Sequence, residues 1–103
     1  MRHGEVRWYT FRSPDKRRPV VILTRNSVLA YLGEVTVAPV TTTIRDIPSE
    51  VSLGRNEGLP RECAVNCDHL QTVAKTGIGS LISTLPAEKM QEVSGAIRFA
   101  LDL

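Results

Sequence analysis

The chain has few cysteines and few histidines, and this scarcity limits the kinds of site it can build. It contains 2 cysteines, Cys63 and Cys67, and 2 histidines among 103 residues. A disulfide framework needs several cysteines, and a closed structural zinc site needs four clustered cysteine or histidine ligands. The sequence indicates neither, and we expect both thiols to be buried or half-buried packing residues.

Long hydrophobic runs are also missing. No apolar segment approaches the ~18 residues of a membrane-spanning helix, and the N-terminus enters a strand pattern without the apolar region of a signal peptide. The sequence therefore predicts a cytoplasmic protein. A chain of 103 residues fits one domain, residues 1–103. A domain of this size buries about 65% of the surface that its unfolded chain exposes.

Charge is nearly balanced, with 13 Lys and Arg against 11 Asp and Glu, so an acidic partner is permitted but not required. The position of the positive charges is more informative than the net charge. Lys16, Arg17 and Arg18 directly precede Pro19 and the apolar residues 20–23. Proline has no amide hydrogen and suits the first position of a strand. We expect a loop over 12–17 and a strand over 19–23, with arginine forks suited to phosphate at the sheet edge.

The rest of the sequence pattern predicts short strands and one amphipathic helix. Strands are expected over residues 4–11, 34–40, 49–53, 62–73 with a bend, and 77–82. Turn-forming Gly, Asn and Pro residues separate these strands, and Glu50 is expected on an exposed face of its strand. A short helical turn falls within 24–32, and Ser83 or Thr84 can cap an amphipathic helix that ends the chain. The fold class is α+β, a mainly antiparallel small barrel with helical cover.

Four short blocks follow one another along this pattern. They are Gly4-Glu5-Val6-Arg7-Trp8, Arg17-Arg18-Pro19-Val20-Val21-Ile22-Leu23, Val37-Ala38-Pro39-Val40-Thr41-Thr42 and Cys67-Asp68-His69-Leu70-Gln71-Thr72-Val73. In this order the blocks resemble the MazF/PemK family of toxin endoribonucleases. The resemblance implies an SH3-like barrel that forms a homodimer and cleaves single-stranded RNA at short sequences without a metal or other cofactor. It also implies neutralisation by a cognate antitoxin whose acidic or disordered segment binds over the active cleft.

The same resemblance assigns two catalytic residues. Arg18 stands where the family places its catalytic arginine before proline, and Thr41 stands where its catalytic threonine follows the third strand. RNA can be cleaved by its own 2′-hydroxyl, so a protein need only align the attack, move protons and stabilise the phosphorane charge. Without the resemblance, a basic loop is usually a solvated face, and a threonine after a strand commonly makes a local turn.

The fourth block departs from the family pattern. Relatives often carry Arg or Lys three residues after the position of Asp68, where this chain has Gln71, and some carry Arg two residues before it, where this chain has Asn66. Both departures remove positive charge, which favours base recognition over charge stabilisation. His69 could serve as a general base, although a lone histidine beside an apolar residue is more often structural. The predicted RNA-binding residues are Arg12, Lys16, Arg17, Thr42, Asn66, Asp68, His69 and Gln71.

An alternative from another class stays open at this point. SH3-like architectures serve many partners, so the chain could be a non-catalytic CcdB-like toxin or binding module that acts on a protein. Trp8 could stack on an RNA base, yet a tryptophan in an alternating strand is more typical of a core.

Overall fold

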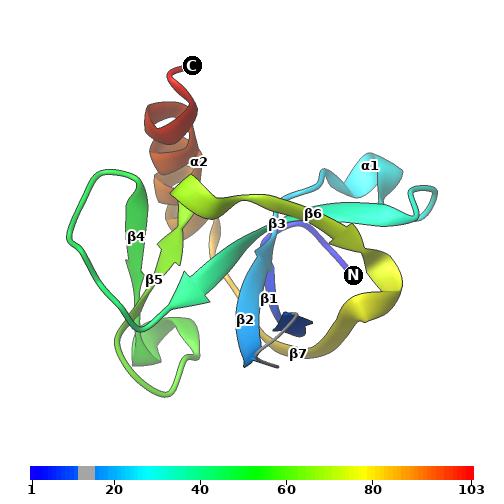
Figure 1. Cartoon of the computed structure of the whole chain (residues 1–103), viewed down its shortest axis with the longest axis horizontal. Helices are drawn as coiled ribbons and strands as arrows, with labels where there is room; N and C mark the ends of the chain where they lie inside the picture. Colours follow the sequence, from blue (N-terminus) through cyan, green and yellow to red (C-terminus); the bar gives the residue numbers. More distant parts are fainter. Residues whose placement is uncertain (12–15) are drawn as a thin grey trace.

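The computed structural model describes residues 1–11 and 16–103, which form an antiparallel sheet with one long helix beside it (Figure 1). The strands are β1 (Glu5–Phe11), β2 (Lys16–Ile22), β3 (Glu34–Thr41), β4 (Glu50–Leu53), β5 (Cys63–Asn66), β6 (Gln71–Ala74) and β7 (Ile78–Thr84). The helices are α1 (Asn26–Leu29) and α2 (Ala87–Leu101), with 3₁₀ turns η1 (Arg55–Glu57), η2 (Cys67–His69) and η3 (Lys75–Gly77). The predicted α+β class is confirmed.

Strand β3 joins the two parts of the sheet. The order of neighbouring strands is β4-β5-β3-β2-β1-β7, and β6 also pairs with β3. The pairing of β3 with β2 ends at Val20 and Pro39, and the next two residues of β3, Val40 and Thr41, pair with β5. Figure 1 shows the end of β3 turning away from the start of β2. The two strands therefore separate where β3 changes its partner.

The apolar residues of β2 face two cores. Val21 packs with Val6 in the core that α2 covers, whereas Val20 and Ile22 pack with Val35 in a second core on the other face. Successive side chains of a strand point to opposite faces, so a strand covered on both faces must be apolar at each position. The β-branched run predicted this burial correctly.

Helix α2 covers the first core with one face. Val93 and Ala96 are buried there, and Met90, Ile97 and Ala100 pack against the same cluster. Their spacing of three and four residues is that of an amphipathic helix, as the sequence predicted. None of the helices in the described residues is long and apolar enough to cross a membrane.

The start of β2 differs from the prediction. The ladder between β1 and β2 continues to the pair Phe11 and Lys16, so the strand begins three residues before Pro19. Pro19 instead directly precedes Val20, where the pairing of β2 with β3 begins. A proline fits there because the strand has one fewer neighbour to bond with. Arg17 and Arg18 consequently belong to the strand, and not to a loop before it.

Two further boundaries differ from the prediction. The bend expected within residues 62–73 is present at η2, but it divides the segment into two strands, β5 and β6, because the Asn66 side chain accepts a hydrogen bond from the Asp68 amide and turns the chain. Ser83 and Thr84 do not cap α2, because both pair with β1 as the last residues of β7. Pro86 occupies the N-cap position of the helix instead.

Candidate active site

Arg18 is carried by ordered strand backbone. It pairs with Tyr9 of β1, and its side chain is half-buried. The strand ladder fixes the backbone on both sides of the residue, so the planar guanidinium samples fewer positions than it would on a free loop. This placement suits an arginine that must meet a phosphate in one geometry.

Thr41 is the last residue of β3 and is half-buried. Its Oγ1 accepts a hydrogen bond from the backbone N–H of Thr43 at 3.0 Å. This is the local turn that threonines commonly make at strand ends. A hydroxyl both donates and accepts, so a bond that uses the oxygen as acceptor leaves the hydrogen to be donated. The turn therefore orients Thr41 as a donor.

The register of β2 and β3 places Arg18 and Thr41 just beyond the same end of the pairing between these strands. The last pair of these strands is Val20 with Pro39, and two residues further along each strand lie Arg18 and Thr41. They flank the point where the two strands separate, and both side chains carry hydrogen-bond donors.

A pocket of about 170 Å³ opens beside Thr41. Its lining is mostly apolar, with Thr41, Thr42 and Arg61 as the polar members. The lining residues are Trp8, Pro19, Val40, Thr41, Thr42, Leu59, Pro60, Arg61, Cys63 and Ile82. The sequence does not indicate this pocket, because residues 59–61 belong to a connection that carries no motif, and their approach to β1 depends on the fold.

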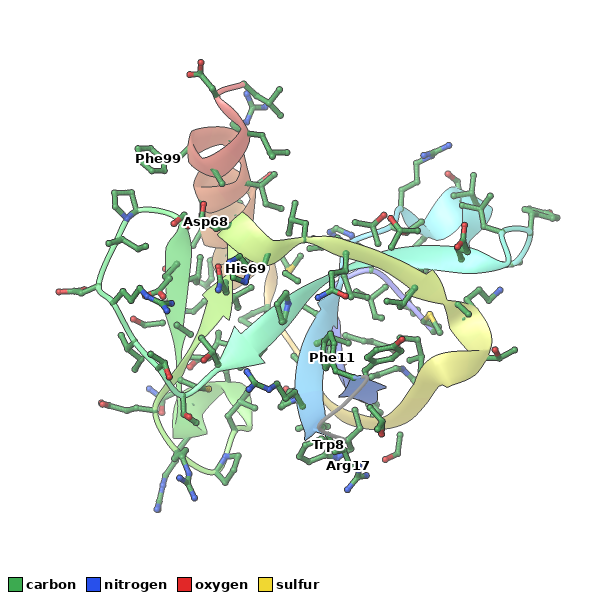
Figure 2. All side chains as sticks on the ribbon, in the orientation of Figure 1. Trp8, Phe11, Arg17, Asp68, His69 and Phe99 are labelled. Atoms are coloured by element: carbon green, nitrogen blue, oxygen red, sulfur yellow. The ribbon has the colours of Figure 1, made fainter. Side chains whose placement is uncertain are left out.

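The basic residues near Arg18 are only partly described. The Arg17 side chain is exposed, and its guanidinium carbon lies 4.3 Å from the centre of the Trp8 ring. Figure 2 shows these two side chains together at the start of β2. Trp8 itself is half-buried, so it is not the fully buried core residue that the pattern favoured. Arg12 lies outside the described residues, as does the side chain of Lys16.

The fourth block forms a turn held by its own side chains. Asn66 is buried, and its Oδ1 accepts from the Asp68 amide at 3.0 Å. Asp68 Oδ2 accepts a 2.5 Å hydrogen bond from Ser49 Oγ, yet the residue remains exposed. The placement of Asn66 favours a structural role over contact with a base, whereas Asp68 still presents part of its carboxylate to solvent.

The predicted residues fall into two groups within the chain. His69 and Gln71 are exposed beside Asp68, at η2 and the start of β6. Figure 2 shows Asp68 and His69 near α2 and well apart from Trp8 and Arg17 at the start of β2. Arg18 and Thr41 therefore lie at the same end of the β2–β3 pairing, and the fourth block lies at a distance from Arg17.

Glu50 orders the loop that follows Thr41, a role the sequence did not indicate. It was expected on an exposed face, but its side chain is only 4% exposed. Its Oε1 accepts from the backbone amides of Arg45 and Asp46 at 2.9 and 3.1 Å. Asp46 has φ 58°, in the left-handed region. A buried carboxylate that binds two amides offsets the cost of this turn, so the prediction for Glu50 was wrong for a reason that lies in the loop backbone.

The two thiols are structural. Burial raises the pKa of Cys67 to about 11, and the negative charge of Asp68 adds to the shift. Burial also raises the pKa of Cys63, with a contribution from Glu57. The thiolate is the form that attacks substrates and binds metals, so neither cysteine is activated at neutral pH. In residues 1–11 and 16–103, no group of three or more His, Cys, Asp or Glu side chains could hold a metal ion.

Comparison with known proteins places the chain in one family over nearly its whole length. Residues 2–101 match the model of the PemK-like, MazF-like toxin of type II toxin-antitoxin systems. Endoribonuclease MazF3 of Mycobacterium tuberculosis is 43% identical over 89 residues, which cover 86% of each chain.

Solved structures share the fold. Mycobacterium tuberculosis toxin MazF-mt6 superposes with a TM-score of 0.89 at 38% identity, over 96% of this chain and 97% of that chain. A mycobacterial endoribonuclease in complex with its cognate antitoxin superposes with a TM-score of 0.89 at 25% identity, over 100% of this chain and 96% of that chain. Sequence and structure therefore agree that this chain belongs to the PemK-like, MazF-like family of toxins of type II toxin–antitoxin systems.

Proposed function

We propose that this chain is a sequence-selective endoribonuclease that cleaves single-stranded RNA, including mRNA, without a metal ion. The observation that carries the proposal is the β2–β3 register, which leaves Arg18 and Thr41 each two residues beyond the last strand pair, where the strands separate. The relatives named endoribonuclease support the activity. The protein acts in the cytoplasm, as the toxin of its toxin–antitoxin pair.

The reaction needs little from the protein beyond placement and charge. The 2′-oxygen loses its proton and bonds to the adjacent phosphorus, while the P–O5′ bond breaks and the 5′-oxygen gains a proton. The products are a 2′,3′-cyclic phosphate and a 5′-hydroxyl. Arg18 donates to the nonbridging oxygens, where negative charge builds in the transition state. Thr41 donates to the same phosphate, and the two contacts align the attack.

RNA is held by groups around this centre. Arg17 is an exposed cation beside the site, and Thr42 is exposed at the pocket. Cationic side chains attract the phosphate backbone without regard to sequence. Asp68 and Gln71 are exposed polar side chains farther along the surface and contact bases away from the scissile phosphate.

A second copy of the chain covers the outer face of α2. Phe99, Leu101 and Leu103 are 61%, 54% and 80% exposed, and Figure 2 shows Phe99 projecting from the helix away from the sheet. Phe99 and Leu101 are two residues apart and lie on different sides of the helix, but all three residues lie at its C-terminal end. Large exposed apolar side chains at one end of a helix mark an interaction surface. The homodimer implied by the family fits this face. A cognate antitoxin with an acidic segment fits the cationic side of the molecule, where Arg17 lies.

The test is incubation of the pure protein with a long RNA in EDTA. Discrete fragments with 2′,3′-cyclic phosphate ends support the proposal, and sequencing of their ends gives the recognised motif. The control is an RNA of the same sequence with 2′-O-methyl groups, which lacks the nucleophile and should stay intact. Intact unmodified RNA, together with a captured protein partner, would instead support a non-catalytic toxin.

A further inference from the structure

The pocket beside Thr41 has a size and lining that the cleavage step itself does not require. Its walls come from separate segments, with Trp8 from β1, Pro19 from β2, and Leu59 and Pro60 from the loop before β5. At about 170 Å³ it holds a single compact group. Pockets for whole small molecules are larger, roughly 300–1,000 Å³.

The open side of this pocket is polar and positively charged. Arg61 and Thr42 line it and are exposed. Arg17 covers one face of the Trp8 ring with its guanidinium, 4.3 Å from the ring centre. An apolar slot with Arg61 in its lining and Arg17 on the adjoining Trp8 ring matches a group that is flat and apolar on its faces and attached to negative charge. A nucleobase on its sugar phosphate has this chemistry.

We propose that this pocket binds the base of a nucleotide directly beside the scissile phosphate, with Trp8 as a stacking surface. The inference rests on the proposed cleavage at Arg18 and Thr41. Thr41 belongs both to the pocket wall and to the phosphate site, so a base in the pocket is joined to the nucleotide whose phosphate Thr41 contacts. The apolar walls contact the faces of the base, and Arg61 and Thr42 supply hydrogen bonds for its edge.

The charge and position favour a base over an apolar side chain of the antitoxin. A peptide side chain would also fill a small apolar slot, but it has no covalent link to a phosphate at Thr41. Base stacking on an aromatic ring also tolerates the positively charged surroundings that Arg17 and Arg61 create, because the RNA backbone neutralises them. The pocket thus couples base recognition to placement of the reacting phosphate.

Trp8 is the single tryptophan of the sequence, so the intrinsic tryptophan fluorescence of the protein reports on this pocket. The ligand is an octanucleotide that contains the motif found by sequencing the fragment ends, with one 2′-deoxy nucleotide at the scissile position to prevent cleavage. We expect binding to quench Trp8 fluorescence. A series of octanucleotides each lacks one base, and we expect the quenching to disappear for one position beside the scissile phosphate.

The cleavable version of the same series gives the functional result. Loss of the pocket base should lower kcat/KM by roughly tenfold or more, as stacking of one base typically contributes. Loss of a base outside the motif is the matched control and should change neither signal. A Trp8→Leu variant should cleave the intact substrate slowly and show no further loss at the pocket position, because base and ring act as one pair. Tyr31→Leu changes an exposed aromatic elsewhere and is the control.

The outcomes separate this inference from the proposed function. RNA that is bound and cut while Trp8 fluorescence stays constant throughout the series overturns the pocket assignment and leaves the nuclease intact. The assignment is also wrong if an acidic peptide with a leucine side chain quenches Trp8 and the octanucleotide does not. RNA that is neither bound nor cut contradicts the nuclease itself. The fluorescence series uses the unaltered protein, so it does not depend on the folding of a variant.

Discussion

Replacing Thr41 with valine tests whether its hydroxyl takes part in cleavage. Valine has nearly the same shape and keeps the β-branched side chain that suits the end of β3, but it cannot donate to a phosphate. Removal of one donor to developing charge lowers kcat by about 10²–10³-fold. Thr41 is half-buried, and partial solvent screening places the expected loss near the lower limit of that range.

The cost to folding should be much smaller than the cost to catalysis. Thr41→Val removes the acceptor for the Thr43 amide. That amide belongs to an exposed residue and can bond to water, so we expect a loss of about 0.5–1 kcal/mol in the free energy of unfolding. Urea denaturation checks this value, and single-turnover cleavage at saturating protein measures the chemical step separately from binding.

Two variants serve as controls. Thr41→Ser keeps the hydroxyl and should restore most of the activity, whereas Thr43→Val alters an exposed neighbour whose backbone, and not its side chain, makes the local bond. Thr43→Val should cleave at the wild-type rate. If folded Thr41→Val protein also cleaves at the wild-type rate, the hydroxyl has no role in the transition state and the site must be reassigned.

Three further predictions concern stability, thiol reactivity and assembly. Burial raises the pKa of Glu5, but its bonds with Arg7 and a backbone amide outweigh this effect and lower the pKa below the usual 4.5. The carboxylate therefore stabilises the fold above about pH 4.5 and loses this effect as the pH falls through the folded-state pKa. Glu5→Gln should flatten the acid dependence of the urea midpoint. An unchanged pH profile would contradict a stabilising role for the Glu5–Arg7 pair. Because burial raises the pKa of Cys67 to about 11, a disulfide reagent at pH 8 should label the thiols only after unfolding, and rapid native labelling would show that they are accessible. Phe99→Asp should convert the homodimer to monomers in light scattering, and a variant that stays dimeric would exclude the outer face of α2 as the interface.

Local pattern was sufficient to predict much of the fold. The β-branched run Val20–Ile22 predicted a strand buried on both faces, and apolar spacing from Met90 onward predicted α2. These patterns depend only on residues close together in the sequence, so they can be recognised without knowledge of the fold. Thr41 was correctly placed at the end of a strand, whereas Arg18 lies within β2, and the catalytic roles of both residues remain predictions.

The errors arise from bonds between a side chain and distant or irregular backbone. Asn66 ends β5 by accepting from an amide two residues on, and the sequence predicted a bend in this segment but not its division into two strands. Glu50 is buried because two loop amides bind it, and those amides converge only when Asp46 adopts φ 58°. The pocket depends on residues 59–61 reaching Trp8 from far along the chain. Such contacts are set by tertiary structure, and a single sequence does not specify them.

The proposed cleavage depends most on Arg18, which is expected to act on the reacting phosphate where β2 and β3 separate. The most direct measurement is the single-turnover rate at which purified Arg18→Ala protein cleaves RNA in EDTA, with Arg17→Ala as the matched control one residue away. We predict at least a ~10³-fold lower rate for Arg18→Ala at saturating protein. Arg17→Ala should need more protein for saturation but reach the wild-type rate. An Arg18→Ala rate equal to wild type, or an equal loss in both variants, would contradict the assignment.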